Sequence, residues 1–185
     1  MIILVGESGS GKSTIEKILD EKYGYKKTVS YTTRLPREGE KDGVDYNFIH
    51  ADDFAEKFND GYFVEVGAYN NWWYGTREEQ YSKNTVCVLT PHGLRQIKKN
   101  LKNQDDLDIH TFYIKVPRRD RLVKMLQRGD DVDEAIRRNQ SDVGQFDGIE
   151  DEVDCVLCNV HYQNTPEQMI EEMMRFIDGE DEKGE

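Results

Sequence analysis

A glycine-rich motif directly after the first apolar run constrains the fold of this chain more than any other feature. Residues 2–5 are all apolar, and the next eight residues read G-E-S-G-S-G-K-S, which fits the pattern G-x-x-x-x-G-K-[ST]. The pattern is specific where it joins a strand to a helix, and the apolar stripe of Ile15, Ile18 and Leu19 predicts that helix. Glycines let the backbone curl so that several N–H groups face a phosphate chain. A chance glycine-rich turn is the weaker interpretation, so the sequence predicts a nucleoside triphosphate site.

The loop residues have different expected roles in that site. Lys12 would reach the β- and γ-phosphates as a point charge and is the first candidate catalytic residue, and the Ser13 hydroxyl would hold Mg²⁺. The following helix places the positive end of its dipole behind the phosphates. The residues expected to contact the triphosphate are Gly6, Ser8, Gly9, Ser10, Gly11, Lys12, Ser13 and Thr14.

The length and charge of the chain limit what kind of protein it is. Its 185 residues suit one compact domain with insertions. The formal charge of −12 argues against general nucleic-acid binding, because an acidic surface repels a phosphate backbone. No apolar run is long enough to span a bilayer, and the N-terminal run is too short for a signal peptide. We therefore expect a cytoplasmic protein with no membrane or nucleic-acid partner, and nothing indicates a protein partner.

Two of the three cysteines form a C-x-x-C pair, Cys155 and Cys158. No second pair or histidine cluster follows at the spacing of a zinc site. Both cysteines fall in an apolar run, 153–160, which predicts a buried strand in which cysteine acts as a small apolar residue. A structural role is therefore favoured over metal or redox chemistry.

Short strand-like runs alternate with helical patterns, which predicts an α/β fold with a largely parallel sheet flanked by helices. The last expected helix has strong start signals, since Thr165 can cap it, Pro166 suits its first position and Gln168 completes a capping box. The acidic tail 179–185 lacks apolar anchors and is expected to fray. The expected strands are 2–5, 28–31, 62–66, 85–89, 109–116 and 155–160. The expected helices are 13–23, 52–59, 93–101, 118–127, 133–145 and 166–177.

Two segments do not fit the pattern of a sheet core. Residues 31–81 are polar, aromatic and rich in turns, which predicts an inserted subdomain. Residues 118–140 contain six of the eleven arginines and are interrupted by R-G-D-D at 128–131, which predicts a hinged helical lid. A core with two mobile insertions suits phosphoryl transfer, because water must be excluded before the phosphoryl group moves.

The start of the first of these segments contains a candidate phosphate grip. Arg34 and Arg37 flank Pro36, which keeps the backbone between them extended or turned. Two guanidinium groups on such a loop suit a phosphate monoester, with Tyr46 as a further hydrogen-bond donor. Taken alone, two arginines near a proline are more often a solvated surface.

A longer pattern around these arginines is far more specific than the glycine-rich loop alone. Residues 29–46 read V-S-Y-T-T-R-L-P-R-E-G-E-K-D-G-V-D-Y, and F-V-E at 63–65, Y-G-T at 74–76, R-G at 128–129 and C-N at 158–159 follow. With these segments the chain resembles the guanylate kinase family over almost its whole length. The resemblance implies a single domain over 1–185 with a P-loop NTPase core (1–30, 82–117 and 141–178), an insertion at 31–81 that binds a nucleoside monophosphate (NMP), and a lid at 118–140. It also implies transfer of the γ-phosphoryl group of ATP, bound with Mg²⁺, to GMP or dGMP.

The resemblance assigns roles to residues outside the loop. Two sets would bind the acceptor: Arg34, Arg37, Tyr46 and Tyr74 would grip its phosphate, and Ser30, Glu65 and Thr76 would read its base. Arg128 matches the family's catalytic lid arginine, and Asn159 matches a residue that lines the adenine of ATP. Guanine chemistry agrees, since one carboxylate can accept from both N1–H and N2–H while a hydroxyl donates to O6. Without the resemblance, Glu65 would read as a solvent-facing strand residue.

The chain departs from the family pattern in two places. The family carries aspartates near the end of the third core strand, whereas this chain has Thr90 there and no carboxylate. Thr90 could act through a water, but a neutral hydroxyl is a weaker partner than a carboxylate. The second lid arginine falls by counting on Asn139, and we assign its catalytic role to the neighbouring Arg138, about 100° away around a helix. The adjacent Trp72 and Trp73 could wall the base pocket, but packing of the subdomain is favoured.

Three functions remain open from the sequence. The first is a kinase for GMP or dGMP. The second is a kinase for another nucleoside or deoxynucleoside monophosphate, which the missing aspartates would permit. The third is a non-catalytic protein-binding module, which the intact Lys12 and Ser13 make the least favoured.

Overall fold

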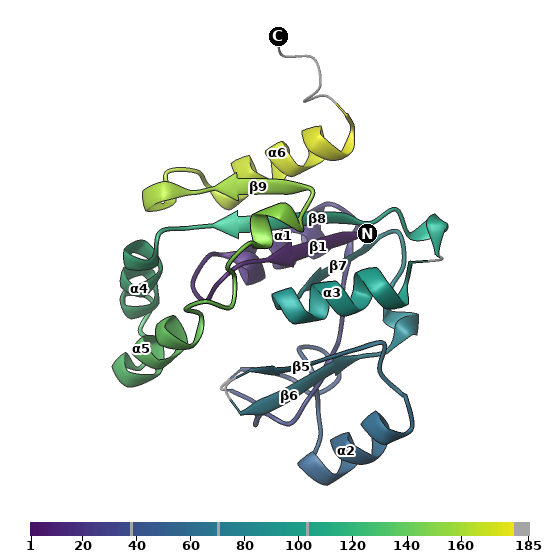
Figure 1. Ribbon diagram of the computed structural model, residues 1–185. Coiled ribbons are helices and arrows are strands. Elements are labelled where there is room, and N and C mark those ends of the chain that lie inside the picture. Colours follow the sequence, from purple (N-terminus) through teal and green to yellow (C-terminus); the bar gives the residue numbers. More distant parts are fainter. Residues whose placement is uncertain (38, 70, 103, 180–185) are drawn as a thin grey trace.

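A five-stranded parallel sheet forms the centre of the molecule (Figure 1). The computed structural model describes residues 1–37, 39–69, 71–102 and 104–179, so the acidic tail from 180 onward lies outside the described residues. The strand order is β2-β7-β1-β8-β9, and every neighbouring pair is parallel. The strands are β1 (Ile2–Val5), β2 (Lys26–Lys27), β7 (Thr85–Val88), β8 (His110–Lys115) and β9 (Cys155–Cys158).

The central strand β1 is buried on both faces, because helices cover both sides of the sheet. Ile2 and Leu4 pack on one face with α1 (Lys12–Lys22) and α6 (Pro166–Ile177). Ile3 and Val5 pack on the other face with α3 (Pro91–Asn100) and the short 3-10 helix η3 (Ile149–Asp151). An apolar run without alternation is what a central parallel strand requires.

A second sheet of four strands, in the order β4-β3-β6-β5, lies beside the first (Figure 1). Strands β5 and β6 form an antiparallel hairpin in which Glu65 faces Thr76. Phe54 on α2 (Ala51–Asn59) stacks on Phe63 with ring centroids 4.7 Å apart and on Trp73 at 6.3 Å. This stacking agrees with a packing role for Trp73. The four strands are β3 (Tyr31–Thr32), β4 (Asn47–Phe48), β5 (Glu65–Tyr69) and β6 (Trp72–Thr76).

Two helices, α4 (Arg118–Gln127) and α5 (Val132–Ser141), follow β8 and pack against each other at one end of the sheet. Arg118 Nε donates to Asn139 Oδ1 at 2.5 Å and so ties α4 to α5. Both residues lie in the segment expected to form a lid. The remaining short 3-10 helices are η1 (Glu78–Gln80), η2 (Asp105–Leu107) and η4 (Val160–Tyr162).

Several expected elements differ from the structure. The strand expected at 28–31 is wrong, because β2 ends at Lys27 and β3 starts at Tyr31, each in a different sheet. The strand expected at 62–66 starts only at Glu65 and belongs to the second sheet, and its partner β6 was missed. The helix expected at 133–145 ends at Ser141.

The prediction that both cysteines of the C-x-x-C pair lie in a buried strand is wrong for Cys158. Strand β9 is at the edge of the sheet, where Cys158 is exposed and Cys155 is half-buried. Across the described residues, no group of three or more histidines, cysteines or acids is placed to hold a metal ion.

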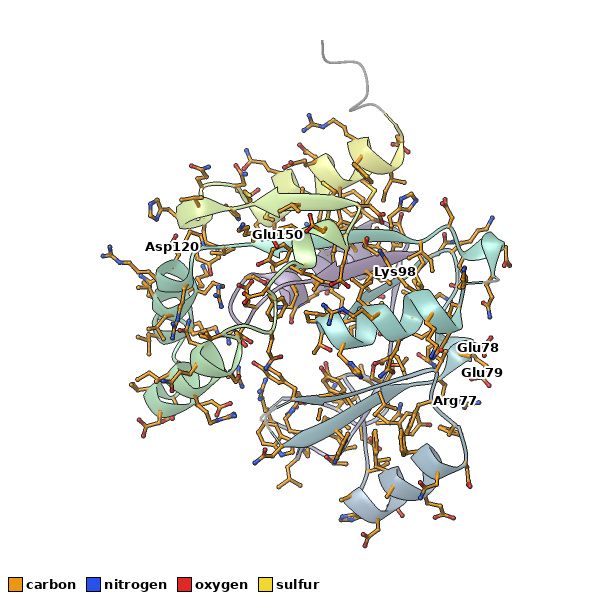
Figure 2. The ribbon with its side chains drawn as sticks, viewed as in Figure 1. Arg77, Glu78, Glu79, Lys98, Asp120 and Glu150 are labelled. Carbon is orange, nitrogen blue, oxygen red and sulfur yellow. The ribbon has the colours of Figure 1, made fainter. Side chains whose placement is uncertain are left out.

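Charged side chains are found on several helices, such as Glu78 and Glu79 on η1 and Lys98 on α3 (Figure 2). Arg77 and Glu79 form one such pair at 2.7 Å, and exposed pairs of this kind contribute little to stability. Within the described ranges, no helix is both long enough and apolar enough to cross a bilayer.

Candidate functional site

The glycine-rich loop links β1 to α1, as the motif requires. Gly11 caps α1 with φ 101°, a left-handed conformation that favours glycine. Gly9 has φ 83°, and a Cβ on it would lie 2.9 Å from the Arg121 carbonyl oxygen. Gly11 is therefore required for its backbone angles, and Gly9 is required both for its backbone angles and for its close packing against α4.

Lys12 is folded back onto its own loop. Its Nζ donates to the Glu7 carbonyl at 2.8 Å and to Ser10 Oγ at 3.3 Å. Burial lowers the Lys12 pKa to about 8, although the charges of Asp142 and Glu7 oppose that effect. A phosphate oxygen in the loop would be a stronger acceptor than either present partner and would favour the charged ammonium.

The residues present fit a magnesium ion that arrives with a nucleotide. Ser13 is exposed in the first turn of α1 and lines both cavities described below. Mg²⁺ in phosphoryl-transfer sites is held largely by phosphates and water, with only one or two protein oxygens. The Ser13 hydroxyl is an oxygen donor of this kind.

Two adjoining cavities, of about 1040 and 320 Å³, separate the loop from the second sheet and from the helices α4 and α5. They therefore join the three segments on which the sequence placed candidate residues. The lining residues they share are Ser13, Glu16, Lys27, Arg34, Arg37, Asp45, Tyr46, Arg128 and Arg138.

The three residues expected to read a base form one hydrogen-bonded set. Thr76 Oγ1 donates to Glu65 Oε1 at 2.5 Å and lies 2.8 Å from Ser30 Oγ, which therefore donates to it. Glu65 is only 5% exposed, and burial raises its pKa to about 7. Ser30 and Glu65 line the smaller cavity, together with Val88, Leu89 and Thr90.

The residues expected to grip a phosphate also lie together. Arg34 is buried, donates two hydrogen bonds to Glu40 at 2.8 and 2.9 Å, and has its guanidinium 5.4 Å from the centroid of the Tyr46 ring. The Tyr46 and Tyr74 rings are 5.9 Å apart. Burial lowers the Arg37 pKa, and the neighbouring Arg138 and Arg34 add to that effect. Three guanidinium groups gathered at one cavity suit a multiply charged anion.

The two lid arginines face the larger cavity but are paired with acids. Arg128 donates to both oxygens of Asp130, at 2.6 and 2.5 Å. Arg138 donates to Glu134 at 2.7 Å and also lines this cavity. Asn139 is buried against Arg118, so of these two neighbours Arg138 is the one at the cavity. The catalytic roles of Arg128 and Arg138 stay predictions.

Asn159 is not brought to the two cavities. Its side chain is buried and is committed to the local chain, accepting from Asn164 N–H and donating to the Asn164 carbonyl, each at 3.0 Å. The strand expected at 155–160 is too long, because β9 ends at Cys158 and the 3-10 helix η4 begins at Val160. Tyr162 instead reaches the loop and donates to the Gly9 carbonyl at 2.6 Å. The adenine contact of Asn159 stays a prediction.

Sequence reasoning missed several residues of the site. Glu16 lines both cavities, and burial raises its pKa to about 7; its place one turn after Lys12 was the signal that could have found it.

Thr90 caps α3 by accepting from Gly93 N–H at 3.1 Å. No carboxylate replaces it along 85–90, as the sequence indicated.

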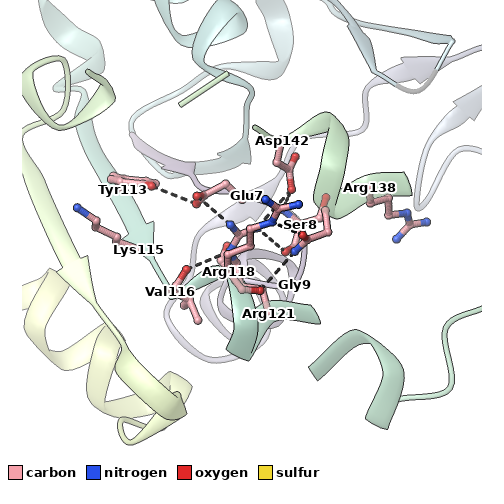
Figure 3. Close-up of polar contacts among 12 residues, drawn as sticks. Glu7, Ser8, Gly9, Tyr113, Lys115, Val116, Arg118, Arg121, Arg138 and Asp142 are labelled. Atoms are coloured by element: carbon pink, nitrogen blue, oxygen red, sulfur yellow. Dashed lines mark hydrogen bonds and ion pairs between the residues drawn. The ribbon is translucent and has the colours of Figure 1, made fainter. Parts of the chain in front are cut away.

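A buried polar cluster supports the loop from the side of α4 (Figure 3). Arg121 donates to Glu7 at 3.2 Å and to Asp142 at 3.4 Å. Asp142 accepts from the Ser8 backbone N–H at 2.8 Å. Tyr113 donates to the other oxygen of Glu7 at 3.1 Å, so this carboxylate is held on both sides. Neither Glu7, Tyr113, Arg121 nor Asp142 was singled out from the sequence.

Comparisons with known proteins agree with this geometry. The guanylate kinase family model matches residues 1–178. Guanylate kinase from Rubrobacter xylanophilus is 31% identical over 98% of this chain and 96% of its own length, and that from Mycoplasmopsis pulmonis is 31% identical over 96% and 93%. The crystal structure of guanylate kinase from Anaplasma phagocytophilum has the same fold, with a TM-score of 0.71, 20% identity, and coverage of 97% of this chain and 85% of that one. The chain belongs to the guanylate kinase family.

Proposed function

We propose that this chain is an ATP-dependent nucleoside monophosphate kinase that transfers the γ-phosphoryl group of ATP to GMP or dGMP, giving ADP and GDP or dGDP. The observation that carries the proposal is the hydrogen-bonded set Ser30–Thr76–Glu65, of which Ser30 and Glu65 line the same cavity as Lys12 and its loop. Membership of the guanylate kinase family supports it.

The chemistry of the buried set favours guanine over adenine. An ionised Glu65 can accept from guanine N1–H and N2–H, and the Ser30 hydroxyl can turn to donate to O6. Adenine presents a lone pair at the ring nitrogen where guanine has N1–H. It would leave an ionised, buried Glu65 with its bond from Thr76 but no donor from the base, at a cost on the order of several kcal/mol.

Phosphoryl transfer at this site needs positioning and positive charge rather than a general base. The attacking oxygen of a nucleoside monophosphate is already ionised, so no proton has to be removed from it. Arg34, Arg37, Tyr46 and Tyr74 orient the acceptor phosphate, while Lys12, Arg128 and Arg138 neutralise the group in transfer. When bound with ATP, Mg²⁺ supplies further neutralisation of the phosphates next to Ser13.

The proposal assigns acceptor binding to 31–81 and closure over both nucleotides to 118–140. Arg37 from the first range and Arg138 from the second already share a cavity wall, which supports that division. It also includes a cytoplasmic reaction, because ATP and nucleoside monophosphates are intracellular metabolites.

An ADP-release assay with ATP, Mg²⁺ and a panel of ribo- and deoxyribonucleoside monophosphates tests the proposal. We expect turnover with GMP and dGMP and none with AMP, CMP or UMP, and we expect Lys12→Met to abolish it. Strong turnover with a pyrimidine and none with guanine would replace the acceptor. A folded protein that turns over no acceptor would instead indicate a non-catalytic module.

A further inference from the structure

Three segments that are far apart in the sequence meet at one residue of the phosphate loop, Ser8. The Ser8 hydroxyl is 2.5 Å from the Tyr69 hydroxyl, at the end of β5. The Ser8 N–H donates to Asp142 at 2.8 Å, and Asp142 is the C-terminal cap of α5. Tyr69 also donates to the other oxygen of Asp142 at 3.5 Å, so the three residues close a ring. We call this ring the Ser8 bridge.

The hydroxyl groups of the bridge can each donate to a protein acceptor without any ligand. Ser8 can donate its hydroxyl proton to Tyr69, which then donates its own to Asp142. Arg121 also donates to Asp142 Oδ2, the oxygen that accepts from Ser8 N–H, at 3.4 Å (Figure 3). Burial raises the pKa of Tyr69, and the charge of Asp142 adds to this, so the phenol remains a neutral donor.

The position of the bridge differs from that of an ordinary structural contact. Ser8, Tyr69 and Asp142 all line the cavity that also holds Glu65 and Lys12. One hydroxyl of the acceptor-binding segment is thus bonded directly to the loop that cradles the donor phosphates, and the cap of the lid helix is bonded to the same residue.

We propose that Tyr69 and Asp142 are positioning residues that couple the donor and acceptor sites through Ser8. This inference rests on the proposed function. A nucleotide that orders the loop also orders β5 through the bridge. The second nucleotide then binds a site that is already ordered, so its binding loses less conformational entropy. The coupling is reciprocal: each nucleotide tightens the binding of the other by the same factor.

The size of the effect follows from the bond that carries it. A neutral hydrogen bond changes an equilibrium constant by about two- to tenfold. Removing the Tyr69 hydroxyl should therefore lower the coupling factor by about that amount, while leaving the ring in place.

Calorimetric titration of MgADP into the protein, with and without saturating GMP, measures the coupling factor. This factor is the dissociation constant of MgADP without GMP divided by its dissociation constant with GMP. This pair of nucleotides cannot react, so binding is read alone. We expect the ratio in the wild type to exceed that in Tyr69→Phe by about two- to tenfold. Ser8→Ala should lose the same amount, and the double variant should lose no more than either single one.

Tyr62→Phe is the matched control. Its hydroxyl is 3.0 Å from that of Tyr31 on β3, a hydroxyl pair of the same kind, and neither tyrosine lines the two cavities of the site. An unchanged ratio in Tyr69→Phe, an equal loss in Tyr62→Phe, or a wild-type ratio of one would overturn the proposal. Failure of the wild type to bind either nucleotide, or to turn over GMP, would instead count against the proposed function.

Discussion

At the scale of single residues, Glu65, the carboxyl proposed to read the base, works against stability at neutral pH. The carboxyl is almost fully buried and its one protein donor is a hydroxyl, so burial holds its pKa at about 7, against an ordinary value of 4.5. The unfolded chain then loses this proton at lower pH than the folded protein does. Stability contributed by the protonated form is present below about pH 4.5 and is lost as the pH rises towards 7.

Replacement of Glu65 by glutamine should remove this loss, because the amide that takes the place of the carboxyl cannot ionise and still accepts from Thr76. The free energy of unfolding of Glu65→Gln should match that of the wild type near pH 4 and exceed it by about 3 kcal/mol at pH 8. Urea denaturation at both pH values measures the difference. Glu56→Gln, an exposed change on α2, is the control, and its free energy of unfolding should match that of the wild type at both pH values. A difference between Glu65→Gln and the wild type that is the same at both pH values would contradict the burial argument.

Arg34 is the residue whose loss should separate acceptor from donor binding. On the proposed function, Arg34→Ala removes charge-assisted bonds to the acceptor phosphate and leaves Glu40 at the cavity without this partner, so the KM for GMP should rise about tenfold to a hundredfold. The KM for ATP should change less than about threefold. Steady-state kinetics with each substrate varied checks both values. Arg77→Ala, which breaks an exposed pair away from these cavities, serves as the control, and an equal rise in both KM values for Arg34→Ala would remove this residue from the phosphate grip.

At the scale of elements, two helices, α4 and α6, match their expected ranges to the residue. The expected range of α6 is confirmed, and its capping box is complete, with Thr165 Oγ1 accepting from Gln168 N–H and Gln168 Oε1 accepting from Thr165 N–H. The end of α5 was missed because its cap, Asp142, is set by tertiary bonds to Ser8 and Arg121 rather than by a glycine or proline. Strand β6 was missed because its residues pair with β3 and β5, and neither partner is visible in local periodicity.

Loss of the Thr165 cap should destabilise α6 without touching the site. Thr165→Ala leaves the N–H of Gln168 without its side-chain acceptor, which should lower the free energy of unfolding by about 1 kcal/mol. The midpoint of urea denaturation should fall while the KM values stay unchanged. Glu171→Ala, on the exposed side of the same helix, should not lower the midpoint, and the same fall there would mean that the cap has no special effect.

At the scale of the whole molecule, an acidic protein gathers arginines around one cleft. The formal charge is −12, yet Arg34, Arg37, Arg128 and Arg138 all face the larger cavity. The sequence identified these arginines as candidate site residues, because each lies in a short local motif. Their common cavity, and the Ser8 bridge beside it, could not, because Tyr69 and Asp142 have no pattern around them that points to the loop.

The pairs Arg34–Glu40, Arg128–Asp130 and Arg138–Glu134 have a consequence for the end of each reaction cycle. On the proposed function, a departing diphosphate would leave these guanidinium groups next to an acid, so no unpaired cation would remain in the vacated cleft. We therefore expect a smaller electrostatic cost of product release than unpaired arginines would impose.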